Sequence, residues 1–288
     1  HRRPGRWAPS APPLGAAVDC TGPRNAVAAG VLTFTGAFVS GGAAPAPLAI
    51  AAAVLATVAA TAGGNAINDY FDRAIDAVNQ PDRPIPRGAI SARGALGVST
   101  ACFAVATVAA LTLPLIAVGI AVVNLLALVI YPEWFKSRPL VGNALVAYLT
   151  GSAFLFGGAA LGNPLEAGVL FLLAAVATLT REIVKDVEDI AGDRQEELRT
   201  FPIVVGRKPA LWAGVAVLVG AVAASVLPYL DGPFGLSYLL VVIPADAVML
   251  LAALYSFRDP AVSQRWLKRG MFLATVAFVV GRAMVVVG

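Results

Sequence analysis

Carboxylate and amide side chains recur at helical spacing in one short stretch of an otherwise apolar chain. In NAINDYFDRAID, the spacing i, i+4, i+8 places Asn68, Asp72 and Asp76 on one side of a helix. Asn65 and Asp69 fall on an adjoining strip. Carboxylates four residues apart repel each other, and apolar surroundings solvate them poorly. A divalent cation would remove that cost, so the stretch predicts a metal site; the alternative is a solvated helix end with ordinary acids.

A second acidic stretch, TREIVKDVEDIAGD, has the same character. Asp186, Asp189 and Asp193 are spaced i, i+3, i+7, which is again one helical face. A basic segment with a Pro-Ile pair follows each stretch, RPI after the first and RTFPI after the second. We interpret this as a weak internal repeat of about four helices, which predicts that the two acidic faces meet at one central cavity.

Basic side chains surround both acidic stretches. Mg²⁺ is usually bound by one or two carboxylates, waters and substrate phosphates, and Lys and Arg bind phosphate oxygens. Acids and bases above apolar helices therefore predict a site for a diphosphate with a long apolar tail, which is a polyprenyl diphosphate. The basic candidates for contact with the substrates are Arg83, Arg87, Lys136, Arg138, Lys185 and Arg199. We interpret the cluster Arg265, Lys268 and Arg269 instead as residues that set the orientation in the membrane or contact lipid headgroups.

The composition indicates the elements that position these residues. The 288 residues are 58% hydrophobic and 13% charged, with a mean hydropathy of +0.79. Soluble domains carry about 25% charged residues, so an all-α polytopic membrane protein is predicted. His1 is the single histidine, and Cys20 and Cys102 have no metal or redox spacing. Imidazole and thiol chemistry are therefore excluded, and carboxylates remain as the chemical resource.

About nine transmembrane helices are predicted, in a bundle around a central cavity. Residues 1–23 are predicted to be a basic, Pro-rich tail, and residues 24–288 a single transmembrane domain. The predicted spans are residues 24–41, 46–68, 94–112, 114–131, 140–161, 165–186, 209–228, 235–256 and 267–287.

Charge is distributed unevenly between the connections. All but Arg282 of the 21 Lys and Arg lie in the tail, in the long connections or at the helix ends beside them. The positive-inside rule therefore predicts a cell-membrane protein with its active site on the cytoplasmic side, its N-terminus inside and its C-terminus outside. Asp246 and Arg282 lie inside predicted helices at comparable depth, where an ion pair between them is possible. An ion-coupled transporter is the distant alternative, although no polar path crosses the predicted bundle.

Three stretches resemble the motifs of the UbiA superfamily of intramembrane prenyltransferases. They are NDYFDRAID with NQPDRPIPRG, REIVKDVEDIAGD with RTFPIVVG, and YPEWFKSRPLVGNALVAYLTG. The resemblance implies nine helices in a ring and Mg²⁺ bound by both acidic motifs. The implied metal ligands are Asn68, Asp69, Asp72, Asp76, Asp186, Asp189 and Asp193. The implied catalytic residues are Asp72, Asp76, Asp189, Asp193 and Lys136.

The resemblance also implies the substrates. The second motif is most similar to the branch of the family that transfers a geranylgeranyl group to the hydroxyl of geranylgeranylglyceryl phosphate, in archaeal ether-lipid synthesis. An aromatic acceptor of quinone biosynthesis, of the 4-hydroxybenzoate type, is the alternative. The usual Arg-Pro-x-Asn entry to the first helix reads GPRN here, so its basic residue is displaced, with Arg24 as the possible substitute. The asparagine of the pattern is kept at Asn25, which the resemblance makes a candidate for substrate contact. A lipophilic acceptor and membrane lipid are the expected partners, with no nucleic acid and no obligate protein partner. A phosphorylated acceptor would require an additional basic side chain in the cavity to bind its phosphate, which Lys185 or Arg181 could supply.

Overall fold

The computed structural model describes residues 13–41, 46–136, 138–195 and 197–287, and these form helices and their connections. The first twelve residues of the predicted tail lie outside this part of the chain. The long helices are α2 (Pro23–Gly41), α3 (Pro47–Asn79), α4 (Ala92–Ala110), α5 (Leu115–Ile130), α6 (Val141–Ala160), α7 (Gly168–Gln195), α9 (Arg207–Ala224), α11 (Leu236–Tyr255) and α12 (Pro260–Val287). The short elements are α1 (Pro13–Cys20), η1 (Tyr131–Phe135), η2 (Pro164–Ala167), α8 (Phe201–Val205) and α10 (Leu227–Leu230).

Each predicted span corresponds to one of the long helices. In the described part of the chain, eight helices are long and apolar enough to cross a membrane, and the 19-residue α2 is the further long helix. The predicted polytopic all-α fold is therefore confirmed. Two helices continue well past their predicted ends: α3 reaches Asn79 and α7 reaches Gln195. Both acidic stretches therefore lie on continuous helix, and α3 alone comprises 33 residues.

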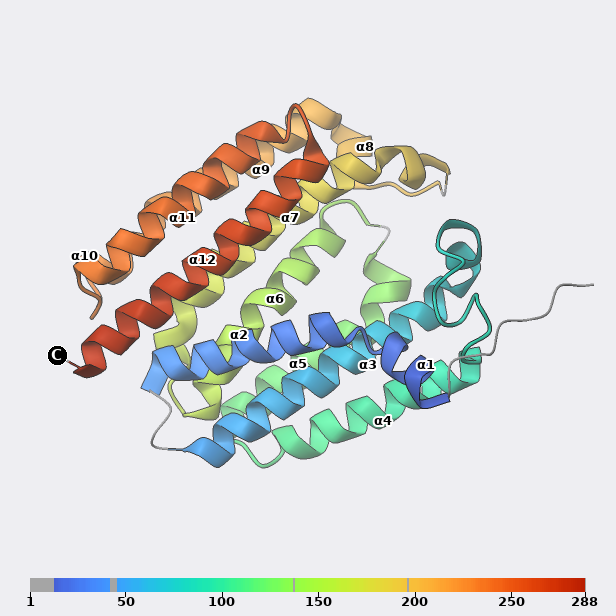
Figure 1. The fold of residues 1–288 in the computed structure, drawn as a ribbon, viewed down its shortest axis with the longest axis horizontal. Coiled ribbons are helices and arrows are strands. Elements are labelled where there is room, and N and C mark those ends of the chain that lie inside the picture. Colours follow the sequence, from blue (N-terminus) through green and yellow to red (C-terminus); the bar gives the residue numbers. More distant parts are fainter. Residues whose placement is uncertain (1–12, 42–45, 137, 196, 288) are drawn as a thin grey trace, which may run out of the picture.

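The helices form two groups (Figure 1). α2, α3, α4, α5 and α6 form one group, and α7, α9, α11 and α12 form the other. α6 packs against α7, and α2 contacts α12, so the two groups meet at two places. Apolar clusters fill the contacts within each group, with fully buried Ala53 and Ala117 in the first and Leu218 and Leu267 in the second.

The contact between α2 and α6 depends on two glycines. A Cβ atom on Gly36 would lie 2.0 Å from the carbonyl oxygen of Phe154. A Cβ atom on Gly157 would lie 2.0 Å from the carbonyl oxygen of Thr33. Small residues allow the backbones of membrane helices to approach closely, which increases their dispersion contacts. The reciprocal pair of glycines therefore fixes the position of α2 against the rest of the bundle.

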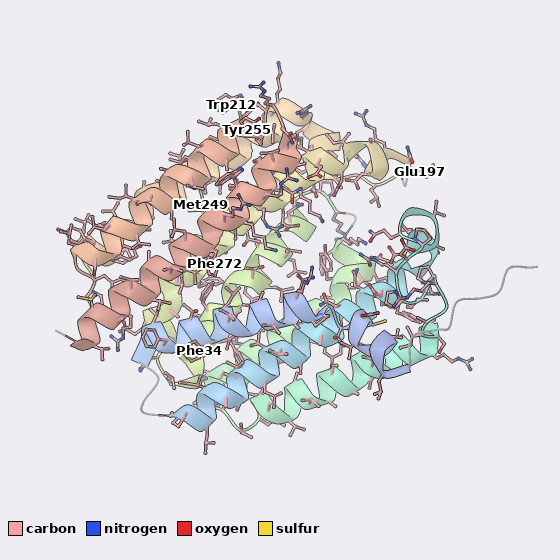
Figure 2. All side chains as sticks on the ribbon, in the orientation of Figure 1. Phe34, Glu197, Trp212, Met249, Tyr255 and Phe272 are labelled. Atoms are coloured by element: carbon pink, nitrogen blue, oxygen red, sulfur yellow. The ribbon has the colours of Figure 1, made fainter. Side chains whose placement is uncertain are left out.

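The connections segregate to opposite ends of the bundle. The segment after α3, the η1 turn and α8 lie at one end, and α10 with the C-terminal end of α12 lies at the other (Figure 1). The first end carries the long charged connections expected from the sequence. Trp212 of α9 and Tyr255 of α11, both labelled in Figure 2, belong to the second helix group. Trp212 packs against Phe257, with 4.9 Å between ring centroids.

The first short helix packs onto the bundle. In α1, Ala16 and Cys20 are buried, and the helix contacts α3 and α4. Burial, with a smaller contribution from the nearby Asp69 carboxylate, raises the pKa of the Cys20 thiol to about 11. The thiol is therefore protonated at neutral pH and inert as a nucleophile.

Asp246 of α11 and Arg282 of α12 do not form the ion pair that their comparable depth made possible. Asp246 is buried, and its carboxylate accepts a hydrogen bond from Ser225 Oγ at 2.6 Å. Among the described residues no ion pair links Asp246 to Arg282, and the buried Nε of Arg282 has no hydrogen-bond partner there. The hydroxyl of the residue that caps the C-terminus of α9 therefore satisfies the buried carboxylate, and the possible Asp246–Arg282 ion pair does not form in the described structure.

Candidate active site

A cavity of about 1210 Å³ lies between the two groups of helices. Most of its wall is apolar, with side chains such as Leu32, Leu149 and Phe154. Met249 on α11 and Phe272 on α12, both labelled in Figure 2, line it from the second group. A space of this size and character can enclose an apolar chain and exclude water.

One end of this cavity carries the acidic stretches. Its lining there includes Asn68, Asp72, Asp76, Asp189 and Asp193, which together define what we call the polar end. The first three come from the last turns of α3 and the other two from the last turns of α7. The structure thus brings two acidic helix faces, more than 100 residues apart in sequence, to one cavity, as the sequence predicted.

The α3 acids are buried and hydrogen-bonded. Asp72 and Asp76 are only 8% and 4% exposed. Asn68 Nδ2 donates to Asp72 Oδ2 at 2.7 Å, and Lys136 Nζ lies 2.6 Å from the same oxygen. Burying a carboxylate is costly unless it is paired and hydrogen-bonded, so these partners permit Asp72 to remain ionised.

Arg83 supplies the second cation at this site. Its Nη1 atom lies 2.9 Å from Asp69 Oδ1 and 3.1 Å from Asp76 Oδ2. Gln80 accepts a further hydrogen bond from Arg83 Nε at 2.9 Å, which fixes the guanidinium over the end of α3. Asp69 does not line the cavity, whereas Asp76 and Arg83 do. Arg83 therefore connects a lining carboxylate to a carboxylate behind it.

Lys136 reaches the site because the chain changes direction after α5. The helix passes into a π-helical turn, η1, and Lys136 follows immediately. Short π-helical segments are rare and are frequently found at functional sites. Leu140 then adopts a left-handed conformation, with φ of 63°, before α6 begins. The reversal places Lys136 against α3, 64 residues away in sequence.

The acids of α7 face two different parts of the structure, the cavity and α6. Asp189 and Asp193 line the cavity, and so does Lys185 one turn before them. Asp186 is outside the lining, and its carboxylate accepts a hydrogen bond from Asn143 Nδ2 of α6 at 2.8 Å. The Asn143–Asp186 contact therefore fixes the rotation of α7 against α6, which turns Asp189 and Asp193 toward the cavity.

The remaining candidates are distributed unevenly. Asn25 lines the cavity, whereas Arg87, Arg138 and Arg199 do not. Arg87 Nη2 lies 2.5 Å from Asp19 Oδ2 and so links the segment after α3 to α1. The guanidinium carbon of Arg138 lies 5.7 Å from the centre of the Phe135 ring.

Sequence reasoning missed three polar residues of this region. Gln80 and Asn143 bind Arg83 and Asp186, and neither carried a signal of its own in the sequence. Lys268, which we interpreted as a topology or headgroup residue, lines the cavity from α12. Lys268 lies about two turns inside α12, between Arg265 and Arg269, so the sequence did not distinguish it from the rest of that cluster.

The polar end can accommodate a divalent cation only together with other ligands. Among the described residues, no three Asp, Glu, His or Cys side chains lie close enough together to bind one metal ion by themselves. Mg²⁺ normally takes one or two carboxylates and completes its shell with waters and substrate phosphates. Paired carboxylates on α3 and on α7 fit that requirement, because each pair leaves room for phosphate oxygens.

A comparison with protein families agrees with this geometry. The sequence model of the UbiA prenyltransferase family matches residues 29–276. The chain belongs to the UbiA prenyltransferase family. It is therefore a multi-pass membrane enzyme that transfers prenyl groups, as the resemblance implied.

Individual proteins resemble this chain over more than nine-tenths of its length. Digeranylgeranylglyceryl phosphate synthase of Natronomonas pharaonis is 61% identical over 270 residues, which is 93% of this chain and 97% of that protein. A solved structure described as that of a digeranylgeranylglyceryl phosphate synthase in membranes superposes with a TM-score of 0.84 at 32% identity, covering 94% of this chain and 99% of the other. A UbiA homologue from Archaeoglobus fulgidus, solved with DMAPP and Mg²⁺, shares the fold at 18% identity with a TM-score of 0.68, covering 94% and 99% of the two chains.

Proposed function

We propose that the protein catalyses the Mg²⁺-dependent transfer of a geranylgeranyl group from its diphosphate to the hydroxyl of geranylgeranylglyceryl phosphate. The observation that carries the proposal is the polar end itself, where paired carboxylates and two cations close one end of a long apolar cavity. The similarity to digeranylgeranylglyceryl phosphate synthases over almost the whole chain supports this choice of donor and acceptor.

In this proposal the acids at the polar end bind the metal. Asp72, Asp76, Asp189 and Asp193 are its ligands, with Asn68 as a neutral oxygen ligand from the same face of α3. Asp69 and Asp186, which lie behind the lining, act by positioning Arg83 and α7. Bound Mg²⁺ supplies positive charge to the diphosphate as negative charge develops on it.

Lys136 and Arg83 change partners when substrate binds. In the structure both cations neutralise the α3 carboxylates. If those carboxylates bound a metal, the ammonium and guanidinium groups would be free to bind the diphosphate oxygens, for which both have strong affinity. In this proposal the same two side chains therefore first neutralise the acids and then orient the leaving group. Arg87, Arg138 and Arg199 lie outside the cavity lining, so in this proposal they bind the substrate only at its rim.

The transfer breaks the allylic C1–O bond, and its electron pair leaves with the diphosphate. The apolar wall of the cavity keeps water away from the electron-deficient prenyl group. The acceptor hydroxyl forms the new C–O bond at C1 and releases its proton to the departing diphosphate or to one of the acidic residues. The products are an ether lipid and diphosphate.

The orientation in the membrane follows the charges of the connections. We place the polar end, the N-terminus and the long charged segments on the cytoplasmic side, and the C-terminus on the outer side. The donor and acceptor tails then lie within the hydrocarbon layer, and the diphosphate lies at its cytoplasmic surface.

The test is a prenyl-transfer assay on protein purified in a neutral detergent. Labelled geranylgeranyl diphosphate and Mg²⁺ are supplied with geranylgeranylglyceryl phosphate or with 4-hydroxybenzoate, and EDTA serves as the control. We expect EDTA-sensitive transfer to the glyceryl phosphate. Transfer to the aromatic acid alone would overturn the proposed acceptor, and the absence of metal-dependent transfer to either would overturn the proposed reaction.

A further inference from the structure

The cavity is lined by more cations than its acidic residues pair with. Five basic side chains line it: Arg83, Lys136, Arg181, Lys185 and Lys268. Arg83 and Lys136 pair with the α3 acids, and Arg181 pairs with Glu182. Within the described residues, neither Lys185 nor Lys268 forms an ion pair. Both ammonium groups are exposed in the cavity, where they can bind an anion.

A contact between α7 and α12 places the two lysines at similar depth. Gln264 of α12 donates a hydrogen bond to Glu188 of α7. The two helices pack together and run in opposite directions (Figure 1). Lys185 lies three residues before Glu188, and Lys268 lies four residues after Gln264. At 1.5 Å per residue, both are therefore about 5 Å deeper in the bundle than the contact.

Lys185 lies one turn deeper than the nearest of the α7 acids that we propose as metal ligands. On α7, Asp193, Asp189 and Lys185 follow one another at intervals of four residues along the cavity wall, so the lysine is the innermost of the three. Lys268 is on α12, which contributes no carboxylate to the polar end. An anion bound by the two lysines would therefore lie beside the diphosphate and nearer to the apolar part of the cavity.

We propose that Lys185 and Lys268 form a subsite for the phosphate of the acceptor, so that the enzyme selects a phosphorylated lipid alcohol. This inference rests on the proposed function. A glyceryl group has three carbons, so its phosphate and its free hydroxyl are at most two carbons apart. When that hydroxyl reaches C1 of the donor, the acceptor phosphate must lie close to the donor diphosphate. Two cations on α7 and α12 would offset the repulsion between these anions.

Lys268 gives the sharper variant because it is remote in sequence from both acidic stretches. The Lys268→Gln and Lys185→Gln variants are compared with wild type for the KM of geranylgeranylglyceryl phosphate and the KM of geranylgeranyl diphosphate. The dephosphorylated analogue geranylgeranylglycerol is tested as substrate or competitive inhibitor. Arg269→Gln is the matched control, because Arg269 stacks over Trp266 and does not line the cavity.

We expect Lys268→Gln to raise the KM of the phosphorylated acceptor about tenfold or more, which is the loss of one charge-assisted contact. The KM of the prenyl diphosphate and the affinity for geranylgeranylglycerol should not change. Lys268→Arg should restore most of the loss, and Arg269→Gln should behave as wild type.

The remaining outcomes overturn the inference. An equal loss for both acceptor forms would show a structural effect, and a rise in the KM of the prenyl diphosphate alone would assign the lysines to the donor. A loss seen only after phosphatidylglycerol is added to the neutral detergent would assign them to lipid headgroups. If wild-type protein fails to use geranylgeranylglyceryl phosphate, the proposed function fails together with the inference; if wild type uses it and the variants match wild type, only the inference fails.

Discussion

Lys136 Nζ lies 2.6 Å from Asp72 Oδ2, so a cation from the connection between α5 and α6 neutralises a carboxylate that is only 8% exposed. Arg83 does the same for Asp76. The acids of α3 therefore have counter-ions from the protein itself. In the proposed mechanism, a metal ion that binds these carboxylates would compete with both cations, and the released cations would then bind phosphate.

Replacement of Lys136 by glutamine should therefore have opposite effects on metal binding and on catalysis. Without the ammonium group, Asp72 loses a competitor, so the free protein should bind Mn²⁺, used as a probe for Mg²⁺, more tightly. Transfer should slow by on the order of 10²-fold, because a contact to the leaving group is lost. Mn²⁺ binding followed by electron paramagnetic resonance and turnover under saturating metal measure the two effects separately.

Lys208→Gln is the control for Lys136→Gln, because Lys208 is exposed at the start of α9 and is outside the cavity lining. It should leave both quantities unchanged. Weaker Mn²⁺ binding in Lys136→Gln would contradict the exchange of partners.

Two neighbouring acids of α3 should differ in their importance. Asp76 lines the cavity, whereas Asp69 contacts Arg83 from behind it. Asp76→Asn should lower kcat by on the order of 10³-fold, because it removes a proposed metal ligand. Asp69→Asn should cost about tenfold or less, because Arg83 retains Asp76 and Gln80 as partners. Single-turnover assays at saturating Mg²⁺ would measure both, and an equal loss would argue against the positional distinction.

The close contact between α2 and α6 predicts a specific sensitivity to added methyl groups. In Gly157→Ala the new Cβ would lie 2.0 Å from the Thr33 carbonyl oxygen, so the backbones must separate. We expect a loss of about 1–3 kcal/mol in the free energy of unfolding and a lower midpoint of thermal unfolding in detergent. Gly119→Ala is the control, because nothing lies within 4 Å of that position and alanine favours helix. A Gly157→Ala midpoint equal to that of Gly119→Ala would show that the helices do not approach so closely.

The charges inside α11 and α12 should act independently. Asp246 is satisfied by Ser225, and in the described structure it forms no ion pair with Arg282. The effects of Asp246→Asn and Arg282→Gln on the unfolding free energy should therefore add to within about 0.5 kcal/mol in the double variant. A coupling energy well above that limit would show that Asp246 and Arg282 interact, and would contradict their independence.

The helices and the acidic faces were predictable from local patterns. Long apolar stretches locate the helices because a membrane span needs about 20 apolar residues. Spacing of three and four residues places Asp72 and Asp76 together on α3 in the same way. Both kinds of information are contained within single helices, and the structure places both acids in the cavity lining.

The rotation of each helix against its neighbours could not be predicted in this way. The spacing of Asp186, Asp189 and Asp193 fits one face, but the hydrogen bond from Asn143 turns Asp186 toward α6. Lys268 lies in a basic cluster that resembles a headgroup-binding surface, yet packing of α12 on α7 directs it to the cavity. These outcomes depend on contacts between helices distant in sequence, and those contacts leave no local pattern.

The length of α3 has a consequence for the products. Its 33 residues extend about 50 Å, whereas the hydrocarbon core of a bilayer is about 30 Å thick. The acids occupy its last turns, so the proposed chemistry takes place at the boundary between the hydrocarbon core and the aqueous phase. The released diphosphate and its metal dissolve in the aqueous phase, and the ether lipid remains in the hydrocarbon core. Each product is diluted into a phase that excludes the other, so their re-encounter at the site becomes rare and the transfer runs in one direction.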